Sequence, residues 1–199
     1  DALPAYDTER PPLEECARLF MNRGVGLLMA QMLFREKKTF TQDEHEFCIR
    51  NMQKAHMAMG DSVLFLEGRY SPSYLERRKR VLASSLADVP DPAQLRTLYE
   101  GALDFKLRPS HDVPDGLTLE AWIAQSVDAY MPVFLWFERA RLGRPDLTWE
   151  QYAAIPARLP ELSGGDKAKN VVRNLRRRSA GLPPVSEWRS PLKSVKRKW

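Results

Sequence analysis

The polar side chains best able to do chemistry lie in residues 42–80, where apolar residues recur every three or four positions. This spacing is typical of one face of an α-helix. Arg50, Lys54 and Asp61 fall beside that face, and a short corner at residues 68–72 leads into a second helical stretch. Cationic side chains beside a carboxylate can bind a phosphate or another anion. We therefore treat this stretch as the main candidate for a binding site.

The helix that precedes this stretch supplies the rest of the predicted site. If the two helices form an antiparallel hairpin, Asn22 and Arg23 lie level with residues 54–61. A half-buried arginine needs a carboxylate or several carbonyl groups as partners. We predict that Arg23 meets Lys54 and Asp61 in a site for an anionic substrate. The predicted substrate-binding residues are Asn22, Arg23, Lys54 and Asp61, with a rim formed by Tyr70, Tyr74 and Arg77.

A purely structural role explains the same residues. A polar group buried in a helical bundle must be paired whatever the protein does, so Asp61 could instead neutralise Arg23, or Arg77 from the next helix. The two interpretations differ in what Arg23→Ala should do. In a binding site it weakens ligand binding and leaves the melting temperature nearly unchanged, whereas in a structural network it destabilises the fold.

The common catalytic and metal-binding patterns are missing from the sequence. His45, His56 and His111 do not stand at Glu-x-x-His spacing, and there is no Cys-x-x-Cys or His-Glu-x-x-His motif. The glycine pair at residues 24–26 lacks the third glycine of a dinucleotide site, and no Gly-Lys-Ser/Thr phosphate loop is present. We predict no catalytic residue, no metal ligand and no cofactor bound by this chain alone.

The elements that must position these side chains are all predicted to be helices, because no stretch shows the alternation typical of a strand. The predicted fold class is all-α, an antiparallel helical bundle of about five main helices with an extended basic C-terminal tail. Residues 1–12 are predicted to be a linker or arm, residues 13–160 the bundle domain, and residues 161–199 the tail, partly helical at 167–178. Within the bundle, helices are predicted from residue 12 to about 34, and at 41–68, 73–85, 91–105, 118–142 and 148–152.

Several residues mark where these helices begin, end or bend. Thr41 with Glu44, and Ser73 with Glu76, have the spacing of a capping box. Gly68 suits a left-handed C-cap, and Pro132 inside the fifth helix predicts a kink or a break.

Small and aromatic residues indicate how the helices pack. Gly24 and Gly26 lower helix propensity, and we expect them to allow another helix to approach closely. Five aromatic residues of the fifth helix could line a pocket, but their helical spacing favours the core. They are Trp122, Tyr130, Phe134, Trp136 and Phe137.

The positive charge of the chain is concentrated at its C-terminus. The sequence has 31 Lys/Arg and 26 Asp/Glu, a net charge of +5. Residues 166–199 hold 11 of the basic residues and 2 of the acidic ones, so the remaining body is mildly acidic. The runs at 173–178 and 193–198 can bind nucleic acid through its phosphates, and can equally dock on the acidic body or on a partner. The alternative function is therefore a non-enzymatic helical interaction module that uses its basic tail on nucleic acid or an acidic partner.

Cysteine content and hydropathy indicate the compartment. Cys16 and Cys48 are too few for a disulfide framework, and the predicted hairpin places Cys16 opposite the region of Gly60 instead. We expect free thiols and a cytoplasmic protein. No apolar run reaches the roughly 18 residues that span a bilayer, so no membrane partner is expected. The first residue is Asp1 and not Met, from which we expect a processed or excised piece of a longer chain.

Three short patterns resemble the helical C-terminal domain of nucleotidyltransferase-like proteins. They are Asn22-Arg23-Gly24-x-Gly-Leu-Leu, Lys54-Ala-x-x-Ala-x-Gly60-Asp61 and Gly68-x-Tyr70-x-x-Ser73-Tyr74-x-x-Arg77. That broad group includes the kanamycin nucleotidyltransferase C-terminal and HEPN-type bundles, and the resemblance covers about residues 12–86. It implies an antiparallel bundle that packs on a nucleotidyltransferase domain and helps to form the acceptor-substrate site.

The resemblance also implies where the chemistry of such a protein lies. The metal-binding carboxylates of that family sit on a separate α/β domain, in a Gly-Ser motif followed by paired Asp residues, and nothing in this sequence matches it. The implied partner is thus a catalytic nucleotidyltransferase domain that precedes residue 1 or belongs to another chain, with Mg²⁺ and a nucleotide triphosphate. Catalytic HEPN domains also carry an Arg and a His separated by four to six residues; Arg50 and His56 have this spacing, whereas Arg108 and His111 do not.

Overall fold

The computed structural model describes residues 12–36 and 39–155 of the chain. These residues form six helices and no strand, so the all-α class is confirmed. The predicted basic tail lies outside the described residues, and so does its predicted helix at 167–178. The predicted arm also lies outside them, except for its last residue, Pro12. The helices are α1 (Leu13–Glu36), α2 (Gln42–Leu66), α3 (Tyr74–Ala83), α4 (Pro92–Leu107), α5 (Leu119–Leu142) and α6 (Trp149–Ala154).

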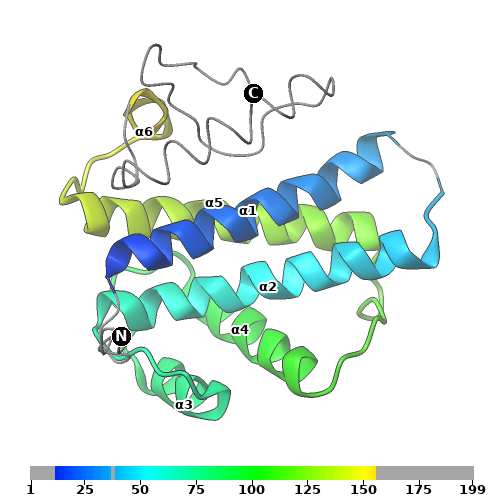
Figure 1. Ribbon diagram of the computed structural model, residues 1–199, viewed down its shortest axis with the longest axis horizontal. Helices are drawn as coiled ribbons and strands as arrows, with labels where there is room; N and C mark the ends of the chain where they lie inside the picture. The colour runs from blue at the N-terminus through cyan, green and yellow to red at the C-terminus, as the bar shows by residue number, and fades with distance from the viewer. Residues whose placement is uncertain (1–11, 37–38, 156–199) are drawn as a thin grey trace, which may run out of the picture. The chain divides into compact units, whose positions relative to one another are not determined.

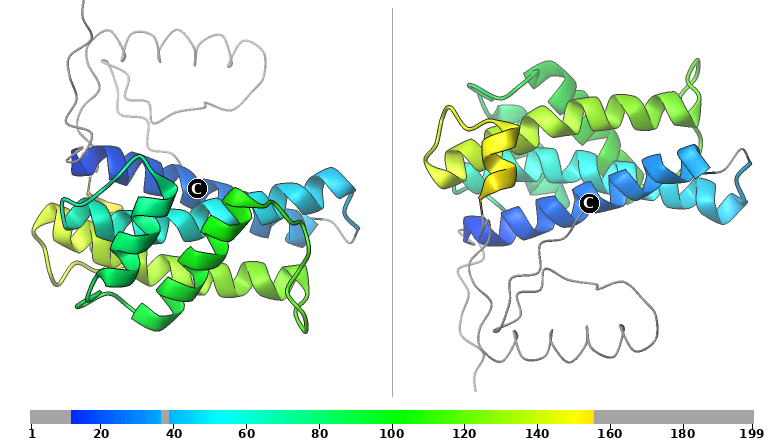
Figure 2. Two further views of the ribbon diagram at one scale, coloured as in Figure 1. Left: turned by 90° about the horizontal axis from the view of Figure 1, so that it is seen from below. Right: turned by 90° about the horizontal axis from the view of Figure 1, so that it is seen from above.

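Helix α2 lies at the centre of the bundle. It forms the predicted antiparallel hairpin with α1 and also packs against α3, α4 and α5 (Figure 1). The views from below and above show α3 and α4 over one side of α2, and α1 and α5 over the other (Figure 2). The buried residues of α2 therefore point in several directions, and they include polar ones such as His56 and Asp61.

The predicted start of α2 is confirmed, whereas that of α3 differs in detail. The Thr41 hydroxyl accepts a hydrogen bond from the Glu44 backbone N–H (3.3 Å), and Glu44 accepts from the Thr41 N–H (3.0 Å), which completes a capping box. Ser73 caps α3 by accepting from the Glu76 N–H at 3.3 Å. The Glu76 carboxylate does not return to Ser73, because it pairs with Arg80 at 2.9 Å. The second capping box is thus only half formed.

The predicted left-handed end of α2 is confirmed at Gly68, which follows the C-cap residue Glu67. The φ of Gly68, +64°, lies in the left-handed region, which costs glycine little. The Gly68 N–H donates to the Phe65 carbonyl (3.2 Å), and the Arg69 N–H donates to the Leu64 carbonyl (2.8 Å). This pair of bonds is a Schellman motif, which reverses the chain and directs Tyr70 back toward α2.

Two glycines of α1 bring neighbouring helices close, as predicted. A Cβ added at Gly24 would lie 3.2 Å from the Tyr130 ring of α5, and one added at Gly26 would lie 2.4 Å from Asn51 Oδ1 of α2. A side chain at Gly26 would require the Asn51 side chain to move, which would disturb its 2.8 Å hydrogen bond to the Phe47 carbonyl.

Helix α5 continues through Pro132, so the predicted break does not occur. Three of its aromatic residues, Tyr130, Phe134 and Phe137, are buried around Phe20 of α1, with ring centroids 4.8–5.7 Å apart. They belong to the core, as their helical spacing predicts. Trp122 and Trp136 remain partly exposed.

Both cysteines, Cys16 and Cys48, are buried free thiols.

Among the described residues, no helix combines the length and the apolar character that crossing a membrane requires.

Candidate functional site

A cavity of about 500 Å³ opens between α1, α2, α3 and α4. One face of α2 forms its floor, because residues spaced three or four apart share that face. The corner after α2 and the loop after α4 complete the wall. The lining residues are Leu19, Arg23, Arg50, Gln53, Lys54, Met57, Ala58, Asp61, Tyr70, Tyr74, Arg77, Phe105, Lys106, Pro109 and His111.

The cavity gathers positive charge from four helices. Arg23 comes from α1, Arg50 and Lys54 from α2, Arg77 from α3 and Lys106 from α4. In the described part of the chain, one carboxylate, that of Asp61, lines the same cavity. Like charges repel one another, so an arrangement of this kind favours a bound anion.

Asp61 and Arg77 form a buried ion pair at the base of the cavity. Both side chains are 4% exposed, and Arg77 Nη1 donates to Asp61 Oδ2. The Tyr99 hydroxyl donates to the other carboxylate oxygen, Oδ1, at 3.0 Å. Asp61 therefore has Arg77 as its main partner, which is one of the two pairings that a structural role predicts.

The protonation of this group follows from its surroundings. Burial raises the pKa of Asp61, while Arg77 and Tyr99 act in the opposite direction. Burial would lower the pKa of Arg77, but the charge and hydrogen bond of Asp61, together with Tyr70 and Tyr99, raise that pKa overall. Because both carboxylate oxygens accept hydrogen bonds, we take the pair to be ionised at neutral pH. Burial, followed by the Asp61 charge, raises the pKa of Tyr99, which keeps its proton as donor.

The tyrosines of the predicted rim hold cations. The Arg77 guanidinium lies over the Tyr74 ring at 4.4 Å and over the Tyr70 ring at 5.1 Å. Lys106 Nζ lies 5.5 Å from the Tyr74 centroid. Cation–π attraction of this kind compensates part of the cost of desolvating the buried Arg77, whereas Lys106 is exposed.

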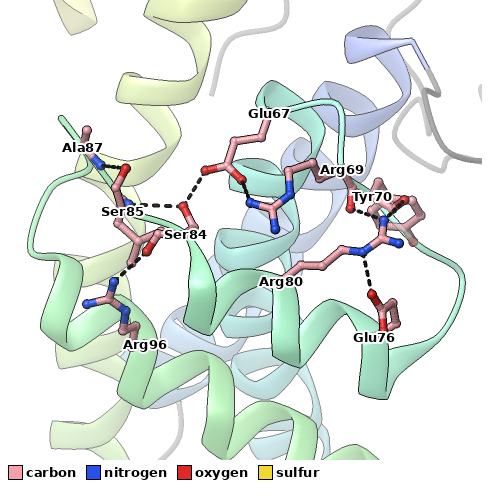
Figure 3. Close-up of polar contacts among 10 residues, drawn as sticks. Glu67, Arg69, Tyr70, Glu76, Arg80, Ser84, Ser85, Ala87 and Arg96 are labelled. Carbon is pink, nitrogen blue, oxygen red and sulfur yellow. Dashed lines mark hydrogen bonds and ion pairs between the residues drawn. The ribbon is translucent and has the colours of Figure 1, made fainter.

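Arg80 fixes the corner that carries Tyr70 (Figure 3). Its guanidinium donates to the carbonyls of Arg69 (2.8 Å) and Tyr70 (3.2 Å), and Glu76 accepts from its Nε at 2.9 Å. Tyr70 also packs on Phe65 of α2, with centroids 4.5 Å apart. The wall at Tyr70 is thus held by backbone contacts as well as by its own ring.

The structure brings together six of the seven predicted site residues. Arg23, Lys54 and Asp61, together with the rim, line the one cavity. Asn22 is exposed on α1 and does not line it. Whether these residues bind a substrate stays a prediction.

Sequence reasoning missed the contributions of α4. Tyr99 fits the apolar spacing of its helix and so gives no sign of its bond to Asp61. The predicted helix ended at Phe105, but α4 continues to Leu107 and places both Phe105 and Lys106 at the cavity. Arg50 was noted beside Lys54 and Asp61 but was not included in the predicted site, although it precedes Lys54 by one helical turn on the same face.

Arg50 and His56 do not share a site. Arg50 lines the cavity and pairs with Glu46 at 2.8 Å. His56 is buried on another face of α2, where its Nε2 lies 2.9 Å from the Ser126 hydroxyl of α5. That hydroxyl donates to the Trp122 carbonyl, so His56 Nε2 is the donor to Ser126. The two side chains therefore lack the joint geometry that a ribonuclease pair requires.

No protein family model, curated protein or solved structure matches this chain.

Proposed function

We propose that this helical domain binds an anionic ligand in the cavity between α1 and α4. The observation that supports the proposal most is the charge of the lining, in which five Lys/Arg side chains accompany a single carboxylate among the described residues. That carboxylate is already used by Arg77 and Tyr99. The electrostatic potential in the cavity is consequently positive, and the low-dielectric walls strengthen it.

A structural network explains only part of this lining. It accounts for Arg77 and Asp61, which neutralise each other inside the bundle. It does not account for Arg23, Lys54 and Lys106, which have no carboxylate at ion-pair distance in the described residues. Lys54 and Lys106 are exposed and Arg23 is partly buried, so water screens much of their mutual repulsion, but no ion pair of the bundle uses these three cations.

The more specific proposal is that the ligand is the acceptor substrate of a nucleotidyltransferase. In that arrangement a separate catalytic domain supplies Mg²⁺ and the nucleotide triphosphate, as the sequence resemblance implies. The cavity lining is consistent with binding and positioning, because Asp61 is engaged on both oxygens and is not available as a general base. The two buried free thiols support a reducing compartment, and we propose the cytoplasm.

Arg23→Ala tests the binding function. In calorimetric titration of the full chain with pyrophosphate, the substitution should weaken affinity roughly tenfold, the value of one charge-assisted contact. Its melting temperature should stay close to that of the wild type, because Arg23 is only partly buried.

Lys79→Ala is the matched control, since Lys79 is exposed on α3 and does not line the cavity. Equal affinities of the wild type and both variants would refute the cavity as the binding site. That result would favour the alternative in which the basic residues near the C-terminus bind nucleic acid or an acidic partner. The acceptor proposal also requires that the chain alone, given Mg²⁺ and ATP, releases no pyrophosphate.

A further inference from the structure

The cations of the cavity fall into two groups. Arg77 is neutralised by Asp61, and Arg50 pairs with Glu46. Arg23, Lys54 and Lys106 have no such partner among the described residues. They come from three different helices, so their charges converge on the cavity from three directions.

Three unpaired cations call for more than one negative charge. A carboxylate brings one, whereas a phosphate monoester carries about −1.5 to −2 at neutral pH and three acceptor oxygens. Oxygens arranged around one phosphorus can meet donors that approach from several sides, which a planar carboxylate does less well.

The two tyrosine rings of the cavity are already occupied. Arg77 lies over both Tyr70 and Tyr74, Lys106 lies over Tyr74, and Phe65 packs on Tyr70. These rings consequently offer little free face on which a ligand ring could stack. Tyr70 and Tyr74 therefore do not provide a stacking surface for an aromatic base.

The cavity is larger than an inorganic phosphate needs. Its volume of about 500 Å³ falls within the range of roughly 300–1,000 Å³ that small-molecule sites have. Apolar groups of Leu19, Met57 and Pro109 supply the contacts for an organic body. In addition, Arg77 Nε and Gln53 Oε1 are buried at this wall without a hydrogen-bond partner in the described residues, so the site has polar capacity left.

We propose that the ligand is a phosphorylated organic molecule, held through a phosphoryl group by Arg23, Lys54 and Lys106 and not through an aromatic base. This inference rests on the proposed binding function and names its ligand class. It predicts that affinity follows phosphate charge and is nearly indifferent to the base of a nucleotide.

The test is a calorimetric titration of the full chain with four probes: ATP, CTP, adenosine and acetate. ATP and CTP should bind with affinities within a few-fold of each other, and adenosine and acetate should not bind at the same concentrations. Lys54→Gln and Arg23→Gln should each weaken ATP binding roughly tenfold, whereas Lys79→Gln should leave it unchanged.

Each other outcome overturns a distinct part of the argument. If acetate binds as tightly as ATP and responds to Lys54→Gln, the cavity binds anions but the phosphoryl inference is wrong. If adenosine binds, or if ATP binds much more tightly than CTP, base recognition governs and the inference is again wrong. If ATP binding is unaffected by Arg23→Gln and Lys54→Gln, the proposed binding function itself fails.

Discussion

Gly60→Ala should destabilise the protein because of a contact that helix propensity alone would not reveal. A Cβ added at Gly60 would lie 2.2 Å from Tyr99 Cδ2 and 2.6 Å from both Cε2 and Cγ. Tyr99 is fully buried, so its ring has no open space into which to move. Displacing it would also lengthen the 3.0 Å hydrogen bond from its hydroxyl to Asp61.

The magnitude combines three terms. Overpacking costs roughly 1–3 kcal/mol, and a hydrogen bond to a charged group contributes about 1.5–3 kcal/mol. Alanine regains about 1 kcal/mol of helix propensity relative to glycine. We expect the free energy of unfolding to fall by roughly 1.5–5 kcal/mol.

Urea denaturation followed by circular dichroism measures this change, with Gly101→Ala as its control. Gly101 is also inside a helix, but it is exposed, and a Cβ there meets no atom within 4 Å. The control should gain up to about 1 kcal/mol. If the two variants are equally stable, the close packing of α2 on Tyr99 is not a feature of the protein and the reasoning fails.

Three further substitutions test other parts of the account by the same denaturation method. Burial lowers the pKa of His56 from 6.5 to about 4. The contribution of the neutral, buried His56 to folding stability is therefore fully present above pH 6.5, and it is lost as the pH falls toward 4. The stability difference between wild type and His56→Gln should therefore shrink by about 3 kcal/mol over that range, and a constant difference would contradict the buried neutral state. Asp61→Ala should cost about 3–5 kcal/mol because it leaves Arg77 buried and unpaired, and combining it with Arg77→Met should recover part of that loss. Arg80→Gln removes the two hydrogen bonds to the carbonyls of Arg69 and Tyr70. It should lower the free energy of unfolding by about 1–2 kcal/mol and also weaken pyrophosphate binding. Unchanged binding would show that the corner does not shape the cavity.

The hairpin and its polar face could be predicted because they depend on local signals. The capping box at Thr41, the helical spacing through α2 and the left-handed Gly68 after its end fix the length and the register of α2. Given an antiparallel α1, that register is sufficient to place Arg23 beside Lys54 and Asp61.

Other features depend on distant contacts and were not predictable in the same way. Glu76 leaves its capping position because Arg80, one turn later, offers a charged partner. The role of Tyr99 depends on the packing of α4 against Gly60, which no local pattern encodes. Helix α5 passes through Pro132 without a break, since its packing against α1 and α2 supports the helix on both sides of that residue.

The most direct test of the central claim is pyrophosphate binding by the full chain with both unpaired cations of the hairpin removed. The account predicts that Arg23→Gln combined with Lys54→Gln lowers affinity roughly a hundredfold, from two contacts of about tenfold each, and leaves the unfolding midpoint nearly unchanged. Wild-type affinity in this double variant would contradict the claim that the cavity between α1 and α4 is an anion-binding site.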